Sequence, residues 1–293
     1  MASDQPWTIG KLLQWTTDYF RQHGSESPRL DAEVLLAHAQ DCERIDLYTA
    51  FDQVASDATR ACFRQLVRRR AAGEPVAYLV GHREFFSLSF AVTPDVLIPR
   101  PETELLVMTA LDAIKAYSTG GRPVDVADVG TGSGAIAVSI ARHAAGSQIT
   151  ATDISPAALE IAKQNVSKLG VEEQVTLIEG DLLAGLPDTQ RFDFVTSNPP
   201  YVSQDELANL PAEIKDYEPH QALVAGPTGA ELIRRLVPQA ADRLRSGGAA
   251  MIEISPMIEV RVVEAFQSED RFESPAVVKD LSGLGRVVTA RRK

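Results

Sequence analysis

The sequence predicts an α/β protein, in which a parallel sheet with helices on both faces follows a smaller all-helical domain. Three observations support this fold class. After Gly121, short β-rich runs alternate with longer amphipathic stretches, which is typical of βαβ units. In the first seventy or so residues, apolar positions recur three and four apart, as they do in helices. The length of 293 residues fits about two domains of roughly 150 residues each.

The N-terminal helical domain is expected to cover residues 1–73. One helix should begin at Ser27 and Pro28, because serine can cap free amides and proline suits the first helical turn. A later helix should run from about Ser56 to Gly73. This helix carries a basic stripe, made of Arg60, Arg64 and Arg68. The stripe is either a solvated helix face or a docking site for an acidic macromolecule.

A linker with a β-hairpin is expected over residues 74–101, because apolar residues there alternate with smaller or polar ones. The alternating positions are Phe86, Leu88, Phe90 and Val92. Two prolines stiffen the end of this linker, and the acids that follow favour a helix start, so a helix should run from there to about Tyr117. The second domain is expected to cover residues 102–293.

The second domain should contain alternating strands and helices that end in an antiparallel hairpin. The expected strands are 124–129, 149–152, 175–178, 192–196 and 249–254. The expected helices are 135–145 and 156–169, and the hairpin pairs Val277-Val278 with Val287-Val288. Because parallel strands end at one edge of a sheet, the loops that follow them should meet at one cleft.

Composition argues against several classes of protein. No apolar run reaches the roughly 18 to 20 residues that a bilayer crossing needs, and the chain does not open with a signal peptide, so we expect a cytoplasmic protein. Cys42 and Cys62 make neither a disulfide framework nor a metal cage, and we expect no metal site. The net charge of −11 argues against a nucleic-acid binder, because it repels phosphate backbones.

A glycine-rich loop joins the first strand of the second domain to its helix. It reads Asp128-Val129-Gly130-Thr131-Gly132-Ser133-Gly134-Ala135. Its glycines let the backbone turn tightly and let a ligand approach the chain, so the residues from Gly130 to Gly134 are candidates for cofactor binding. The loop also fits the G-x-G-x-x-A pattern of dinucleotide sites, which leaves a nicotinamide cofactor open.

Two carboxylates follow the next two strands of the second domain. Asp153 is placed to accept hydrogen bonds from both hydroxyls of a ribose, which fits NAD and S-adenosylmethionine alike. Asp181 can accept a hydrogen bond from an adenine amine while Leu182 covers the ring. Since both carboxylates end strands of one sheet, we expect them to lie together beside the glycine loop.

The segment Asn198-Pro199-Pro200-Tyr201 follows the fourth strand and carries the strongest chemical signal. Its prolines fix the backbone, so Asn198 Oδ1 and the Pro199 carbonyl become rigid acceptors for a planar NH₂ group. Tyr201 can lie against that group and screen it from water. We expect Asn198, Pro199 and Tyr201 to be catalytic, the whole segment with Pro200 to bind substrate, and Asn198 to reach the cofactor as well.

Such a segment suits methyl transfer to an amide or aromatic amine, whose nitrogen lone pair is delocalised. Holding both hydrogens against two acceptors biases the nitrogen towards a tetrahedral, attacking geometry. A single hydrogen bond contributes only about 1 kcal/mol net, whereas alignment of nucleophile, methyl and sulfur removes roughly 7–11 kcal/mol from the barrier. Positioning should therefore dominate, and a sulfonium supplies the electrophile without a metal.

On these residues, the chain resembles the release factor glutamine methyltransferases, the HemK or PrmC family, over nearly its whole length. The run Val96 to Glu104, which contains Ile-Pro-Arg-Pro-Glu-Thr-Glu, separates this family from other enzymes with an Asn-Pro-Pro-Tyr motif. Further stretches that carry the resemblance are the glycine loop, Pro28 to Leu36, Gly73 to Leu79, Glu84 to Phe86, Leu97 to Leu106 and Glu218-Pro219.

The resemblance implies a seven-stranded Rossmann-like sheet of the S-adenosylmethionine-dependent methyltransferases, with a small N-terminal helical domain for substrate recognition. It implies methylation of the side-chain amide nitrogen, N5, of the glutamine in the Gly-Gly-Gln loop of peptide-chain release factors, with S-adenosylhomocysteine as the other product. By position, Gly130 to Gly134, Asp153 and the Asp181-Leu182 pair would hold the cofactor, and Asn198 to Tyr201 the glutamine. We expect a monomer without a nucleic-acid or membrane partner.

Three alternatives stay open at this point. An N6-adenine DNA methyltransferase would present the same planar NH₂ after flipping the base out of the duplex. An NAD-dependent oxidoreductase would use the same glycine loop. A non-catalytic protein-binding module would use neither the planar NH₂ group nor the glycine loop. Residues 204–229 follow no regular pattern, so their role in substrate binding is left open.

Overall fold

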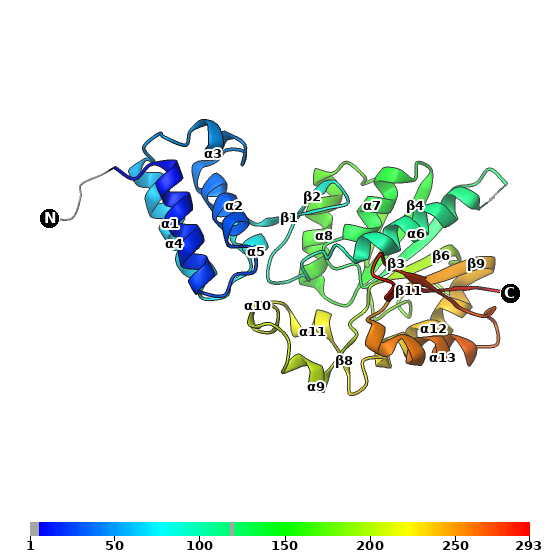
Figure 1. The fold of residues 1–293 in the computed structure, drawn as a ribbon. Coiled ribbons are helices and arrows are strands. Elements are labelled where there is room, and N and C mark those ends of the chain that lie inside the picture. Colours follow the sequence, from blue (N-terminus) through cyan, green and yellow to red (C-terminus); the bar gives the residue numbers. More distant parts are fainter. Residues whose placement is uncertain (1–5, 118–119) are drawn as a thin grey trace. The chain divides into compact units, whose positions relative to one another are not determined.

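The computed structural model describes residues 6–117 and 120–293, which divide into two compact units (Figure 1). The helical unit runs to Gly81 and also includes Ala212–Tyr217. The sheet unit comprises His82–Pro211 and Glu218–Lys293. The chain therefore leaves the sheet unit once, contributes a short segment to the helical unit, and returns.

The helical unit packs its helices around a core of buried aliphatic and aromatic side chains, which include Leu13, Phe20, Leu35, Leu36 and Leu47. Its helices are α1 (Ile9–Gln22), α2 (Pro28–Gln40), α3 (Asp46–Thr49), α4 (Asp57–Ala71), α5 (Val76–Val80) and α10 (Ala212–Lys215). Helix α5 lies within the range that the sequence assigned to a linker.

The capping of two of these helices follows the expected chemistry, whereas a third departs from it. Thr8 and Ser56 have extended backbones, and their hydroxyls accept hydrogen bonds from the amides of Lys11 and Thr59. The prediction that Ser27 caps α2 is wrong. Its backbone, at φ −131° and ψ 58°, lies outside the extended region of a cap, and its side chain makes no capping hydrogen bond.

The sheet unit contains the seven-stranded sheet that the sequence predicted, and the α/β fold class is confirmed (Figure 1). The strands are β3 (Val124–Val129), β4 (Ser147–Asp153), β5 (Val175–Glu179), β6 (Phe192–Ser197), β9 (Leu244–Glu253), β10 (Ala276–Lys279) and β11 (Gly285–Arg291). Their order is β10-β11-β9-β6-β3-β4-β5. Strand β11 is antiparallel to both β10 and β9, and the other neighbouring pairs of this sheet are parallel. The expected pairing of Val277-Val278 with Val287-Val288 is present.

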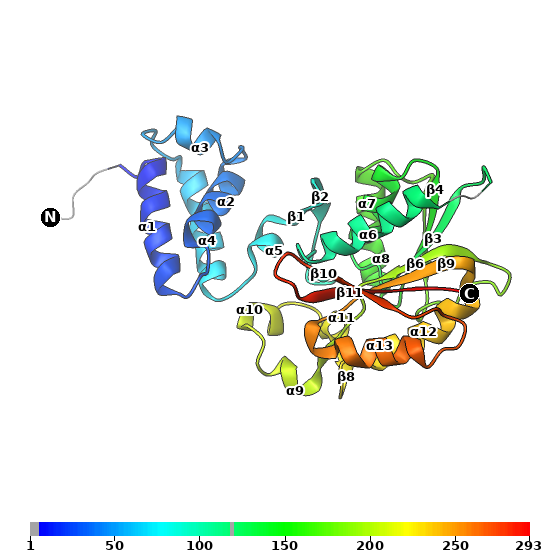
Figure 2. The same ribbon diagram turned by 45° about the vertical axis from the view of Figure 1, so that its right-hand side comes forward.

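Helices cover both faces of this sheet, with α6 and α7 on one side and α12 and α13 on the other (Figure 2). The larger helices are α6 (Thr103–Ala116), α7 (Ala135–His143), α8 (Pro156–Lys168), α12 (Glu231–Arg243) and α13 (Glu259–Gln267). The short elements are α9 (Gln204–Leu207), α11 (His220–Leu223), the 3₁₀ turn η1 (Pro256–Ile258) and the paired strands β7 (Val202–Ser203) and β8 (Val224–Gly226).

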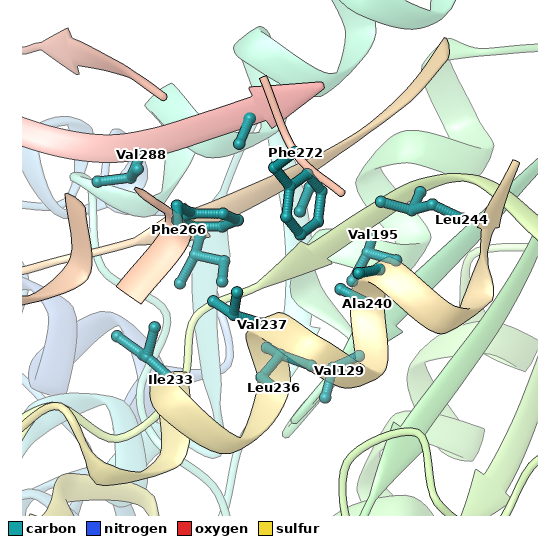
Figure 3. Close-up of a cluster of buried hydrophobic side chains, with 14 of the residues drawn as sticks. Val129, Val195, Ile233, Leu236, Val237, Ala240, Leu244, Phe266, Phe272 and Val288 are labelled. Atoms are coloured by element: carbon teal, nitrogen blue, oxygen red, sulfur yellow. The ribbon is translucent and has the colours of Figure 1, made fainter. Parts of the chain in front are cut away.

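Alternate residues of each strand enter the two cores, because successive side chains of a strand point to opposite faces. Val129 and Val195 belong to the core under α12 and α13, where Phe266 and Phe272 are also buried (Figure 3). Val126 and Phe194 belong to the opposite core, under α6, α7 and α8. Apolar strands buried on both faces are what a parallel sheet requires.

A hairpin of β1 (His82–Phe85) and β2 (Leu88–Ala91) precedes α6. The prediction that Phe86 belongs to a strand is wrong, because Phe86 and Ser87 form the two-residue turn. Both have positive φ, of 49° and 59°, which a tight hairpin turn requires at its central positions. None of the helices in the described parts of the chain is long and apolar enough to cross a bilayer.

Candidate active site

A cavity of about 360 Å³ opens at the carboxyl edge of the sheet, within the sheet unit. Strand β3 lies between β4 and β6, so the strand order reverses at β3, and open α/β sheets bind ligands at such a point. The predicted site residues that line the cavity are Gly130, Thr131, Gly132, Ser133, Asp153, Asp181, Leu182, Asn198 and Pro200. The volume suits a small molecule, since ligand cavities span roughly 300–1,000 Å³.

The glycine loop presents bare backbone to this cavity. Gly130 and Gly132 have φ of +70° and +55°, and a Cβ added to either would meet no atom within 4 Å. Packing therefore does not require glycine at these two positions, but the left-handed backbone does, and the open space admits a ligand close to the chain. Gly134 differs, because its added Cβ would lie 3.4 Å from the Cβ of Ala162 on α8. Gly134 is outside the cavity lining and serves the packing of α7 on α8.

Asp128 connects the glycine loop to strand β6 through hydrogen bonds, a role that the sequence did not predict. Its Oδ2 accepts a 2.7 Å hydrogen bond from Thr131 Oγ1, and its Oδ1 accepts one of 3.1 Å from Thr196 Oγ1. The side chain is fully buried, and burial raises the pKa of Asp128 to about 6. The carboxyl group thus ties the loop to strand β6. The signal in the sequence was an acid inside an apolar strand.

Asp153 ends β4, and its carboxylate is held in a fixed orientation. Oδ2 accepts a 2.8 Å hydrogen bond from the Gly132 amide, and Oδ1 accepts one of 2.9 Å from the Ser155 amide. Burial raises the pKa of this carboxyl group. Each carboxylate oxygen can accept a second hydrogen bond, so Asp153 can still bind two hydroxyls of a ligand.

Asp181 lies on the cavity wall but is paired with a residue that the sequence did not single out. Arg235 of α12 donates a 2.5 Å hydrogen bond from Nη2 to Asp181 Oδ2, and both side chains are about half exposed. Leu182 follows with a φ of 57°, which is uncommon for a residue with a side chain. Arg235 also lines the cavity. A ligand amine that binds to Asp181 would therefore contact a carboxylate that is already paired with an arginine.

Asn198 follows β6 and lies on the wall of the cavity. Its Nδ2 donates a 3.1 Å hydrogen bond to Oγ1 of Thr103, the first residue of α6. No group in the described residues donates a hydrogen bond to Asn198 Oδ1. The preceding residue, Ser197, donates a 2.7 Å hydrogen bond from Oγ to the Val129 carbonyl and joins the ends of β6 and β3. The Asn198 carbonyl oxygen is thus available to a ligand.

Pro199 and Tyr201 are not among the residues that line the cavity. Tyr201 packs on the core under α12 and α13, and its pKa is raised by burial and by the nearby charge of Glu253. The expectation that Tyr201 screens a substrate amide stays a prediction, as does the role of the Pro199 carbonyl.

A second ion pair holds the segment before α6. Arg100, which lines the cavity, donates a hydrogen bond to Glu218 Oε1, and the Ile98 amide donates one of 3.3 Å to Glu218 Oε2. Glu218 is almost fully buried. Sequence reasoning singled out both stretches separately but had no signal that they meet, since 118 positions separate the paired residues.

No three His, Cys, Asp or Glu side chains of residues 6–117 and 120–293 are arranged to hold a metal ion. The polar groups of the cavity are instead backbone amides, carboxylates, hydroxyls, the amide side chains of Asn198 and Gln221, and two arginines that are each paired with an acid. This set suits an uncharged or weakly charged organic ligand with hydroxyl and amine donors.

Comparison with known proteins matches both units to described families. Residues 11–81 match the PrmC N-terminal domain, and residues 103–214 match the methyltransferase small domain. A methyltransferase from Pyrococcus furiosus of known structure is 19% identical with a TM-score of 0.50, and the match covers 78% of this chain and 98% of that one. At that identity the structural likeness shows the fold alone.

Two curated relatives are similar over essentially their full length. The release factor glutamine methyltransferase of Rhodopirellula baltica is 50% identical over 291 residues, which cover 99% of this chain and 98% of the relative. The release factor glutamine methyltransferase of Nitratidesulfovibrio vulgaris is 38% identical over 292 residues, which cover 99% of this chain and 97% of the relative. This chain therefore belongs to the family of release factor glutamine methyltransferases.

Proposed function

We propose that this enzyme transfers a methyl group from S-adenosylmethionine to N5 of the glutamine side chain in the Gly-Gly-Gln motif of peptide-chain release factors. The observation that carries the proposal is the unpaired Oδ1 of Asn198, which lies beside the glycine loop on a backbone stiffened by two prolines. Family membership favours this reaction over the oxidoreductase, DNA-methyltransferase and non-catalytic alternatives.

The cavity residues fit S-adenosylmethionine. The open backbone at Gly130 and Gly132 leaves room for a ligand, and the remaining lone pairs of Asp153 match a ribose diol. Asp181 and Leu182 line the same cavity, and in this proposal they offer an acceptor to an adenine amine and an apolar cover to its ring. When bound, the cofactor supplies a methyl group on a positively charged sulfur.

The protein's contribution is to position the acceptor nitrogen. The glutamine NH₂ group has two hydrogens, and Asn198 Oδ1 and the Pro199 carbonyl can accept one each. This orientation holds the nitrogen lone pair towards the methyl group, and such alignment is worth roughly 7–11 kcal/mol of the barrier. In this proposal Tyr201 limits access of water to the amide.

In this proposal, the helical unit binds the release factor. On α4, Arg60 pairs with Asp57, whereas Arg64 and Arg68 are exposed and could meet acidic groups of a partner. Part of the irregular stretch 204–229 belongs to this unit, because residues 212–217 pack there. We further propose that the enzyme acts in the cytoplasm as a monomer without nucleic acid.

Mass spectrometry of a purified release factor tests the proposal. After incubation with the enzyme and S-adenosylmethionine, the peptide with the Gly-Gly-Gln motif should gain the mass of one methyl group, on the glutamine. A release factor with glutamate in place of that glutamine is the matched control and should gain nothing. An unmodified wild-type peptide, under conditions where the enzyme binds the cofactor, would refute the proposed function.

A further inference from the structure

Three side chains from distant parts of the sequence meet at the end of the central strands. Strands β6 and β9 are parallel neighbours, and Ser197 pairs with Ile252. Asn198 follows directly after β6 and Glu253 ends β9, so the two residues lie at the same level of the sheet. Thr103 accepts a hydrogen bond from Asn198 Nδ2 at 3.1 Å, and its hydroxyl lies close enough to the Glu253 carboxyl group to lower the pKa of that group.

Glu253, the last residue of β9, is an unusual residue for the buried end of a strand. Its side chain is 2% exposed, and Oε2 has no hydrogen-bond partner anywhere in the described chain. A buried polar group without a partner destabilises the fold, and more so when the group is charged. The carboxyl group of Glu253 has no direct part in the methyl transfer proposed above. We therefore considered what else this buried group does beside Thr103.

The chemistry of the three groups sets the direction of their hydrogen bonds. An ionised carboxylate only accepts, so a hydrogen bond between Glu253 and Thr103 has the Thr103 hydroxyl as its donor. The hydroxyl can then only accept from Asn198, which places the NH₂ side of that amide at Thr103. The carbonyl oxygen of Asn198 is thereby left for the substrate.

A protonated Glu253 removes this constraint. Its carboxyl group can donate to Thr103, whose hydrogen is then free to turn towards Asn198. The Asn198 amide can then rotate and present its NH₂ group to the cavity, where it would oppose the NH₂ group of a glutamine. We propose that Thr103 and Glu253 are positioning residues that keep the carbonyl oxygen of Asn198 directed at the substrate, an inference that rests on the proposed function.

The surroundings of Glu253 make its charge sensitive to pH near neutrality. Burial raises its pKa, the nearby Thr103 hydroxyl lowers it, the charge of Glu102 raises it, and the charges of Arg286 and Arg100 lower it, with a result of about 7. The Tyr201 phenol also lies close enough for Glu253 to raise its pKa. Below this pKa the carboxyl group is neutral and activity should fall, and above it the ionised form fixes Asn198.

Steady-state kinetics of the full-length enzyme with a release factor test the inference. Glu253→Gln carries a neutral amide that can donate to Thr103, so kcat at pH 8 should fall about tenfold or more, which corresponds to about 1.4 kcal/mol. The KM for the release factor should change less than about threefold, because the loss lies in the transition state. The decline of wild-type kcat from pH 8 to pH 6 should disappear in this variant.

Substitutions at Thr103 provide an independent measurement. Thr103→Val removes the hydroxyl and should lower kcat as Glu253→Gln does, whereas Thr103→Ser restores the hydroxyl and should recover most of that loss. The matched control is Thr109→Val on the same helix, because Thr109 Oγ1 donates only to the Leu105 carbonyl. This control should retain the wild-type kcat and its pH profile.

The possible results separate the two proposals. Wild-type kcat and pH profile in Glu253→Gln and Thr103→Val would overturn the positioning role while the methylation of glutamine stands. If Glu253→Gln does not fold, as judged from thermal unfolding, the Thr103→Val and Thr103→Ser pair decides by the same criterion. A wild-type enzyme that leaves the glutamine unmodified would instead overturn the proposed function itself.

Discussion

Asn198 and Thr103 form a hydrogen bond of 3.1 Å although 95 positions separate them in the sequence. The bond joins the end of the central strand β6 to the first turn of α6. Because the NH₂ group of the amide is occupied in this way, the carbonyl oxygen is the part of Asn198 that a substrate can meet. This pairing distinguishes the effects expected at Asn198 from those at the residues proposed to bind the cofactor.

Asn198→Ala should abolish methyl transfer while the affinity for S-adenosylmethionine stays within a few-fold of wild type. The substitution removes the acceptor that orients the glutamine, whereas the glycine loop and Asp153 are unchanged. Calorimetry with the cofactor and mass spectrometry of the release factor measure the two effects. A large loss of cofactor affinity together with activity would show that Asn198 mainly holds the cofactor.

Asp153→Ala should weaken cofactor binding about tenfold or more, because two ribose hydroxyls lose a charged acceptor worth roughly 1.5–3 kcal/mol. The alanine variant also leaves the amides of Gly132 and Ser155 unpaired, so its stability should fall. Asp153→Asn is the matched variant, since it keeps the shape and one acceptor oxygen. Unchanged cofactor affinity in calorimetry for both variants would remove Asp153 from the site.

Gly134→Ala should destabilise the fold more than Gly146→Ala. Both glycines have φ near +80°, so both substitutions share a backbone cost of roughly 1–2 kcal/mol. Only Gly134 would bring a Cβ against Ala162, at 3.4 Å, whereas Gly146 has open space around it. Urea unfolding of the two variants measures the difference. Equal losses of stability would show that the added methyl group packs against Ala162 without a steric cost.

Asp193→Asn should change how the free energy of unfolding depends on pH. Asp193 is fully buried, and burial alone would raise its pKa, but hydrogen bonds from Arg122 and the Asp125 amide and the charges of Arg122 and Arg245 lower the net pKa. A lowered folded-state pKa stabilises the protein above the unfolded value of about 3.9 and loses that contribution as pH falls through the folded value.

The measurement is urea unfolding of wild type and Asp193→Asn at pH 7 and at several values below pH 4. The variant should lose about 1.5–3 kcal/mol at pH 7, since it removes the charge of a buried carboxylate that is hydrogen-bonded to a partly exposed arginine, and its deficit should shrink as the pH falls. Asp188→Asn is the control, because Asp188 is exposed although it pairs with Arg243. A deficit that does not change with pH would contradict the role of the Asp193 charge.

The sequence predicted most of the sheet because its signals are local. The strands that became β3, β4, β5 and β6 are short β-rich runs between helical stretches, and the glycine loop marks the turn after β3. The errors at Ser27 and Phe86 are also local, since each depends on one backbone conformation. At Phe86 an apolar side chain continued the strand pattern, whereas the hairpin turn determined the actual φ.

The sequence predicted those residues of the site that lie at the ends of strands, and not the others. Asp153 and Asn198 end strands, and the fold brings both to the cavity. Thr103, Arg235 and Glu253 gave no such signal, because their roles depend on contacts between distant segments. Glu253 in particular lies in an apolar run that reads as an ordinary strand, so its burial and its unpaired oxygen appear only in three dimensions.

The chain order of the two units has a consequence for how the protein is made. Arg70 of α4 pairs with Asp31 of α2 and also with Glu213, which belongs to the segment that rejoins the helical unit much later in the sequence. The Tyr217 hydroxyl likewise donates to the Ala72 carbonyl. A ribosome must therefore synthesise most of the polypeptide before the N-terminal helices acquire their last partners.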